Sequence, residues 1–123
     1  MCGGIIGFLF GGLDGLFYAL VSFTVIDYIT GVLSAIKQKK LSSNTGAWGI
    51  VKKICIFLIV AVGHIIDVFI IGNGSALRTA VIFFYLANEG ISIIENCAGL
   101  GVIKSQKLIQ ILEQVRKENE NNE

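Results

Sequence analysis

The chain has 123 residues, of which 54% are hydrophobic and 15% are charged, and its formal net charge at pH 7 is +1. About a quarter of the residues in a soluble domain are charged, so this composition is too apolar for an ordinary soluble domain. The apolar residues lie in long runs, which indicates membrane-spanning segments within one small domain. The low net charge argues against nucleic acid as a partner, because binding to nucleic acid relies on a strongly basic surface.

The first apolar stretch, residues 2–36, is too long for one straight membrane helix. As a single helix it would measure about 50 Å, against about 30 Å of hydrocarbon in a bilayer. The segment GGLDG (residues 11–15) is the expected break, because glycine and aspartate disfavour helix interiors. We therefore predict a glycine-rich flank over residues 1–15 and a first spanning helix over about 16–36.

Two further apolar runs predict two more spans. We expect a polar loop up to residue 53, a second span over about 54–71, a turn of small residues, and a third span over about 77–100. These spans form a three-helix membrane domain over residues 16–103. The side chains of the loop that we expect at the membrane surface, as topology signals in contact with lipid, are Lys37, Lys39, Lys40, Trp48, Lys52 and Lys53.

The tail, residues 104–123, is charged, and the spacing of its apolar residues predicts a short amphipathic helix with Ser105 as its candidate N-cap. Basic residues gather in the loop after the first span and in this tail, whereas the N-terminal flank holds none. The positive-inside rule then places the loop and tail in the cytoplasm. The predicted fold is an all-α membrane protein with three spans, its N-terminus outside and its C-terminus inside.

Each predicted span has one polar or small-residue side. In the third span the polar positions recur at intervals of three and one, which is a continuous face of an α-helix, and residues such as Ile82 and Ile91 cover its lipid-compatible remainder. The candidate pore-lining or oligomer-packing residues are Asp27, Thr30, Gly31 and Ser34 in the first span, His64 and Asp67 in the second, and Arg78, Asn88, Glu89, Ser92, Glu95 and Asn96 in the third.

Acidic residues outnumber fixed bases inside the predicted spans. The only fixed base there is Arg78, whereas the acidic residues are Asp27, Asp67, Glu89 and Glu95. Unpaired carboxylates in hydrocarbon cost several kcal/mol each. They can be protonated, can pair with Arg78, His64 or lysines at the helix ends, or can line water. Three helices alone shield such groups poorly, so we expect the chain to self-associate with its polar faces turned inward.

The sequence carries no phosphate-binding glycine loop, no HExxH motif, no Cys/His metal set and no nucleophile elbow. We therefore expect neither enzymatic activity nor a catalytic residue, and no metal or other cofactor.

Several motifs together resemble the small holins of phage lysis and toxin secretion, the family that includes the holin-like protein of clostridial toxin loci. They are DYITGVLSAI (27–36), LSSNTGAWGIVKK (41–53), Asp67, and LRTAVIFFYLANEGISIIENCAGLGV (77–102). The resemblance covers about residues 20–115. The chain departs from it in having no proline after the third span, and in its glycine-rich flank.

This resemblance implies a pore former without enzymatic activity that oligomerises in the bacterial cytoplasmic membrane. Its lesions release an endolysin or a large toxin, without direct contact being necessary. The resemblance implies that the functional positions of the family motif, which pack the oligomer or line its lumen, correspond to residues of all three spans and of the loop. They are Asp27, Thr30, Gly31, Ser42, Ser43, Gly46, Gly49, Lys52, Lys53, Asp67, Arg78, Asn88, Glu89, Ser92, Glu95 and Asn96. Two alternatives remain open on the residues alone. One is a small oligomeric cation or proton channel, or a transporter subunit, that uses Asp67, Glu89 and Glu95. The other is a structural membrane protein whose tail recruits a partner.

Overall fold

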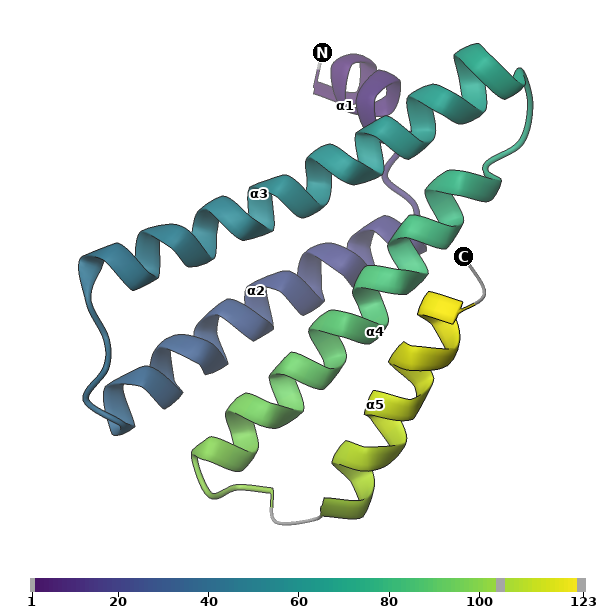
Figure 1. Ribbon diagram of the computed structural model, residues 1–123. Helices are drawn as coiled ribbons and strands as arrows, with labels where there is room; N and C mark the ends of the chain where they lie inside the picture. Colours follow the sequence, from purple (N-terminus) through teal and green to yellow (C-terminus); the bar gives the residue numbers. More distant parts are fainter. Residues whose placement is uncertain (1, 104–105, 122–123) are drawn as a thin grey trace.

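The computed structural model describes residues 2–103 and 106–121, and all regular structure in this part of the chain is helical. The elements are α1 (Cys2–Phe10), α2 (Gly15–Lys37), α3 (Ser43–Ile65), a π-helical segment η1 (Ile66–Ile71), α4 (Ala76–Gly99) and α5 (Gln106–Asn121). The predicted all-α class is confirmed. In Figure 1, α2, α3 and α4 lie side by side, and α5 runs back along α4 in the opposite direction.

Three of these helices can cross a membrane by length and composition. They are α2 with 23 residues, the continuous α3–η1 rod with 29 residues, and α4 with 24 residues. This confirms the prediction of three membrane-capable helices. The bounds of α2 and α4 lie one residue away from the predicted 16–36 and 77–100 at each end.

The second long helix begins at Ser43 instead of residue 54, so most of the predicted loop over residues 37–53 is helical. A capping box starts it. The Thr45 N–H donates to Ser42 Oγ at 3.1 Å, and the Ser42 N–H donates to Thr45 Oγ1 at 3.1 Å. These bonds satisfy two backbone N–H groups that the first turn of a helix otherwise leaves without partners.

The break between α1 and α2 lies in the glycine segment where the sequence predicted it. Gly11 and Gly12 have φ angles of +81° and +109°, a region that glycine enters without steric strain. Asp14 then begins α2 as its N-cap, because its Oδ1 accepts the Phe17 N–H at 2.9 Å. The predicted helix in the tail is present as α5, and its candidate N-cap Ser105 lies outside the described residues.

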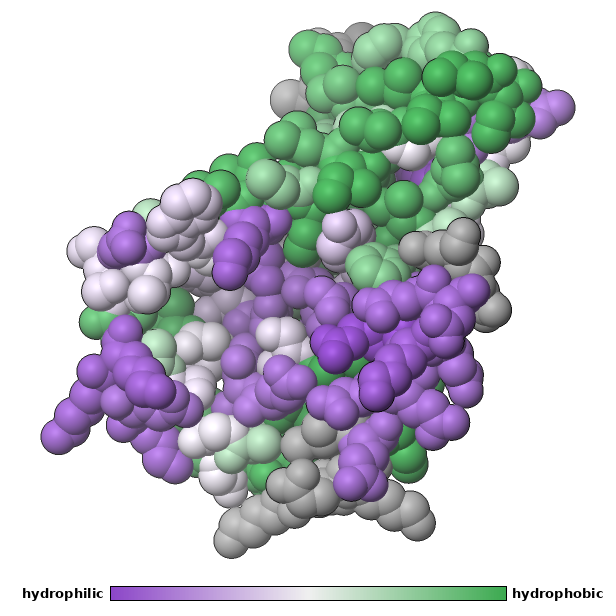
Figure 2. All heavy atoms as spheres, in the orientation of Figure 1, coloured by the Kyte–Doolittle hydropathy of each residue, from purple (hydrophilic) through white to green (hydrophobic). Residues whose placement is uncertain are grey.

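The two ends of the bundle differ in chemistry. At one end, Gly72 closes η1 with φ +96° and donates its N–H to Asp67 O at 2.9 Å. We call this end, which also holds α1, the Gly72 end. We call the opposite end, where residues 38–42 connect α2 to α3, the Lys40 end. Figure 2 shows hydrophobic surface over the Gly72 end and hydrophilic surface across α5 and the Lys40 end.

The apolar core between the long helices is small. Leu20, Ile56, Val60 and Ile82 form it, and Ile91 is also buried. Ile82 and Ile91 were expected to face lipid, and the structure corrects this, since α4 packs one apolar side against α2 and α3. Exposed apolar side chains are instead found along the length of α2, at Tyr18, Val21, Val25, Ile26, Ile29, Leu33 and Ile36. The outer side of α2 therefore suits contact with lipid tails.

The capping box generates a prediction for the start of α3. Ser42→Ala removes the side-chain acceptor of the Thr45 N–H and should destabilise this first turn by about 1 kcal/mol, which is about a fivefold change in local opening. Amide hydrogen exchange of the reconstituted protein should show faster exchange at Thr45. The matched control is Ser43→Ala, one residue inside the helix, which should leave that rate unchanged; equal rates in all three proteins would contradict the cap.

Candidate functional site

One lysine and two carboxylates meet between the three long helices. The Nζ of Lys53, on α3, contacts Asp27 Oδ2 from α2 and lies 2.6 Å from Glu89 Oε1 of α4. Asp27 and Glu89 are 6% and 3% exposed, and the Lys53 side chain is 21% exposed. The contact with Glu89 is an ion pair that lacks the alignment of a hydrogen bond. We call these three residues the charge cluster.

An amide from α4 completes the cluster on the side of α2. Asn96 Nδ2 donates to Asp27 Oδ1 at 2.9 Å and to Thr30 Oγ1 at 3.0 Å. Gly31 lies beside this amide, and a Cβ added to it would make an ordinary contact with Asn96 Nδ2 at 3.5 Å. The structure thus brings these predicted residues of the first and third spans together.

In the charge cluster, Lys53 supplies a positive charge to two of the surplus acidic residues, Asp27 and Glu89. Breaking a buried ion pair leaves an uncompensated charge, which costs more than the pair itself contributes. Of the remedies that the sequence allowed, pairing with a base is the one found here, although the base is a lysine inside a helix. Lys53 was predicted at the membrane surface, and the structure corrects this, since α3 begins at Ser43 and places Lys53 about three turns inside the helix.

A second network lies at the Gly72 end and is built on Arg78, which is 3% exposed. Its Nη1 and Nη2 donate to Asp14 Oδ2 and Oδ1 at 2.9 and 3.1 Å, and Nη2 also donates to Gly12 O at 3.1 Å. Nε donates to Phe10 O. The guanidinium therefore holds the junction between α1 and α2 against α4. Its hydrogen bonds to Asp14 lower the pKa of that carboxyl below its ordinary value of 3.8.

Asp67 and His64 belong to this second network. Asp67 is fully buried and accepts the N–H groups of Leu77 and Arg78 at 3.1 and 2.9 Å, so it caps the start of α4 from the end of α3. A Cβ added to Gly11 would lie 2.8 Å from His64 Nδ1. These residues, with Arg78, join the helix ends at the Gly72 end and lie away from the charge cluster.

The remaining predicted residues of α4 face a polar hollow of about 540 Å³, which Lys52 and Trp48 of α3 also line. Asn88, Ser92 and Glu95 lie along it, and Glu95 is exposed. We call these three residues the polar face of α4. A second hollow of about 230 Å³ lies on the other side of the charge cluster. It is lined by Tyr28 of α2 and by Gly46 and Gly49 of α3, which lie beside the Tyr28 ring. Asp27 and Lys53 of the cluster thus line both hollows.

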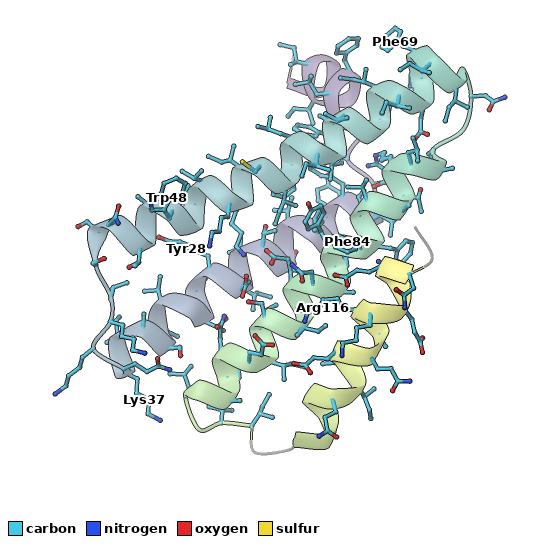
Figure 3. All side chains as sticks on the ribbon, in the orientation of Figure 1. Tyr28, Lys37, Trp48, Phe69, Phe84 and Arg116 are labelled. Carbon is cyan, nitrogen blue, oxygen red and sulfur yellow. The ribbon has the colours of Figure 1, made fainter. Side chains whose placement is uncertain are left out.

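The other predicted residues lie near the Lys40 end. Ser34 is buried against Gly99, where an added Cβ would lie 2.9 Å from Ser34 Oγ. Lys37 Nζ donates to Leu100 O at 3.0 Å and so helps to end α4. Lys37 and the other predicted surface residues Lys39, Lys40, Trp48 and Lys52 have exposed side chains. Figure 3 shows Trp48 on the outer side of α3, and Lys37 near the turn that ends α2.

Sequence reasoning missed several parts of these networks. It treated Asp14 only as a helix breaker, and its link to Arg78 spans 64 positions of sequence. It did not foresee that Tyr28 Oη donates to Gly46 O at 3.2 Å. The Ser42–Thr45 pair was a usable signal for the start of α3. Within residues 2–103 and 106–121, no three His, Cys, Asp or Glu side chains are grouped so that they could hold a metal ion.

These features indicate a small multi-pass membrane protein with three membrane-capable helices and an internal charge cluster. Residues 4–117 match the model of the bacteriophage holin family, and the chain belongs to that family. It is a family of membrane proteins without enzymatic activity.

Individual relatives agree with this assignment. An uncharacterized protein of Listeria monocytogenes is 51% identical over 100 residues, which cover 81% of this chain and 71% of that protein. A 14.9 kDa protein in the nagH 3′ region of Clostridium perfringens is 41% identical, covering 92% and 86% of the two chains. A protein of Bacillus phage phi105 named "Probable holin" is 45% identical, covering 77% and 69%. No solved structure matches the chain.

The charge cluster predicts a strong effect of Lys53. Lys53→Met leaves Asp27 and Glu89 buried without a cation and should destabilise the bundle by about 3–5 kcal/mol. Thermal unfolding followed by circular dichroism in detergent measures this loss. The neighbouring exposed lysine gives the control, because Lys52→Met should leave the transition temperature nearly unchanged. Adding Asp27→Asn and Glu89→Gln to Lys53→Met should restore stability; equal stability of the two lysine variants would contradict the cluster.

The Arg78–Asp14 pair predicts that acid loosens α1. Because the folded-state pKa of Asp14 is lowered, its contribution to stability is present above the ordinary pKa of 3.8 and is lost as pH falls through the lower folded value. Spin labels on cysteines at the exposed positions Ile5 and Ile70, with native cysteines replaced, should give a narrow distance distribution at pH 7 that broadens in acid.

In the same labelled protein, Asp14→Asn should broaden the distribution at pH 7, because it removes the charge that Arg78 binds. Glu120→Gln, which neutralises an exposed carboxylate on α5, is the control and should leave the distribution narrow. A narrow distribution in Asp14→Asn would show that α1 is held by its apolar contacts alone.

Proposed function

We propose that this protein is a holin that oligomerises in the bacterial cytoplasmic membrane and opens non-selective lesions. Through these lesions an endolysin reaches the cell wall, or a large toxin leaves the cell, without needing to touch the protein. The observation that carries the proposal is the polar face of α4, which borders a hollow of about 540 Å³ on a helix that is apolar enough to cross a membrane.

The physical support is the cost of leaving this face in lipid. A carboxylate in a membrane-spanning helix costs up to about 3 kcal/mol on insertion scales, with the largest cost at the bilayer centre, and Glu95 lies four residues before the end of α4. Asn88 and Ser92 add polar groups that have no partners in hydrocarbon. Facing another copy, or water enclosed by several copies, removes this cost. The apolar outer side of α2 can then remain against lipid.

The distribution of charge supports an orientation with the N-terminus outside and the C-terminus in the cytoplasm. Lys37, Lys39 and Lys40 lie at the Lys40 end, beside the end of α4. The Gly72 end carries no lysine among residues 2–12 or 66–77. Basic residues are retained on the cytoplasmic side of bacterial membranes, so the Lys40 end suits that side.

A timed opening follows from these surfaces. At low density, the polar faces stay covered in small assemblies. At higher density, larger rings hydrate those faces and widen into lesions. A fall in membrane potential favours the step if charge moves through the field, since one charge is worth about 2.3 kcal/mol per 100 mV.

The proposal is tested by leakage of dextrans of graded size from liposomes that contain the protein. A holin should release large dextrans above a threshold density. Glu95→Gln should raise that threshold severalfold, because a neutral amide is less costly in lipid and weakens the drive to assemble. Glu120→Gln, the same change on the exposed end of α5, should leave it unchanged. Release of small ions alone would instead support the cation-channel alternative.

A further inference from the structure

α5 occupies an unexpected place for the charged tail of a membrane protein. Figure 1 shows it folded back beside α4, and Figure 3 shows Arg116 directed toward α4. Arg116 Nη1 lies 3.4 Å from Asn88 Oδ1. Asn88 is next to Glu89 of the charge cluster, which is level with Asp27 near the middle of α2. The tail thus reaches the central depth of the predicted spans.

The two flanks of the bundle at this depth have opposite chemistry. The outer side of α2 exposes apolar side chains such as Val25 and Ile29, which fit lipid. The outer side of α5 exposes Lys117, Glu118 and Glu120. Charged side chains at the depth of hydrocarbon face protein or water, because lipid tails cannot solvate them. The flank of the molecule that carries α5 therefore borders water.

The contact between α5 and α4 covers the same surface that the proposed pore would expose. Arg116 lines the hollow of about 540 Å³ together with Glu89 and Glu95, so its positive charge faces carboxylates. The contact is incomplete, since Asn119 Nδ2 is enclosed without a hydrogen-bond partner. Ile111 and Val115 remain about half exposed. Such a helix is held, yet it can be released.

We propose that α5 is an intramolecular plug that docks on the polar face of α4 and fills the water-lined space of the closed assembly. The inference rests on the proposed function and adds its regulation. Opening then requires α5 to leave α4, with the chain turning at Gly101, whose φ is +82°. The polar face that α5 releases becomes available to line the lesion.

A reversible cross-link tests the plug. In a full-length background with the native cysteines changed to alanine, Asn88→Cys with Arg116→Cys places thiols on both sides of the contact. In liposomes loaded with dextran, oxidation with a short added dithiol should join the two thiols through a bridge that replaces the length of the Arg116 side chain, because a direct disulfide needs closer Cβ atoms. This intramolecular cross-link should lower leakage at least about tenfold, and a reductant should restore it. The control pair, Asn88→Cys with Glu118→Cys, has its second thiol on the outer side of α5. It should not cross-link, and oxidation should not change its leakage.

Charge reversal provides the second arm. Arg116→Glu places a negative charge in the hollow that Glu89 and Glu95 also line, so it should repel α5 and lower the protein density needed for leakage severalfold. Lys117→Glu makes the same charge change on the exposed side of α5 and should leave that density unchanged.

The outcomes separate this inference from the proposed function. Leakage without any cross-link, or equal leakage in the oxidised and reduced forms, overturns the plug and leaves the holin proposal standing. Either result would mean that α5 does not dock on α4 in the membrane and lies elsewhere, for example on the cytoplasmic membrane surface. A cross-link in a protein that never leaks in any variant overturns the holin proposal, and with it the plugging role, while the docking of α5 on α4 stands.

Discussion

The position of Lys53 between Asp27 and Glu89 is the constraint on which the rest of the bundle depends. Each of the three side chains comes from a different long helix, so their ion pairs fix the rotation of each helix about its own axis. The apolar core is too small to do this alone, since lipid tails compete with side chains for apolar contact and offer no drive for helices to associate. Once the cluster is formed, Asn88, Ser92 and Glu95 must lie on the outside of α4.

The second network performs a different task at the Gly72 end. Arg78 gathers the ends of α1, α2 and α4, and Asp67 joins the end of the α3–η1 rod to the start of α4. Both residues bind backbone groups, and Arg78 also binds the Asp14 side chain. The two networks together leave the helices little freedom to rotate or to slide. Rearrangement during assembly is therefore expected between copies of the protein, or between α5 and α4, more than within the three-helix unit.

The sequence allowed the membrane class and the three long helices to be predicted, because hydrophobic runs and glycine breaks are local signals. The start of α3 was missed because Ser42 and Thr45 lie in a stretch whose polarity resembles a loop. The role of Lys53 could not be predicted from position alone, since it depends on helices that meet far from it in sequence. The polar stripe of the third span was correctly placed on one face, yet that face divides in three dimensions. Glu89 and Asn96 turn into the bundle, whereas Glu95 faces outward. The burial of Ile82 and Ile91 was also missed, because the helical spacing does not show which side of α4 packs against α2 and α3.

The unequal lengths of the long helices have a consequence for the surrounding lipid. The α3–η1 rod has 29 residues and α2 has 23, so their lengths are about 44 Å and about 35 Å. The tip of the rod stays apolar, with Phe69 and Ile70 exposed by 61% and 75%, and α1 lies against it through Phe8. The apolar part of the rod begins only after Lys53, which is level with the middle of α2, so this part is offset from α2 toward the Gly72 end. A bilayer that covers the apolar tip is deformed there, at a cost of a fraction of a kcal/mol per Å of hydrophobic mismatch. Neighbouring copies that share one deformed patch of lipid reduce its total perimeter. In the proposed assembly, this shared deformation draws copies together before any of their side chains touch.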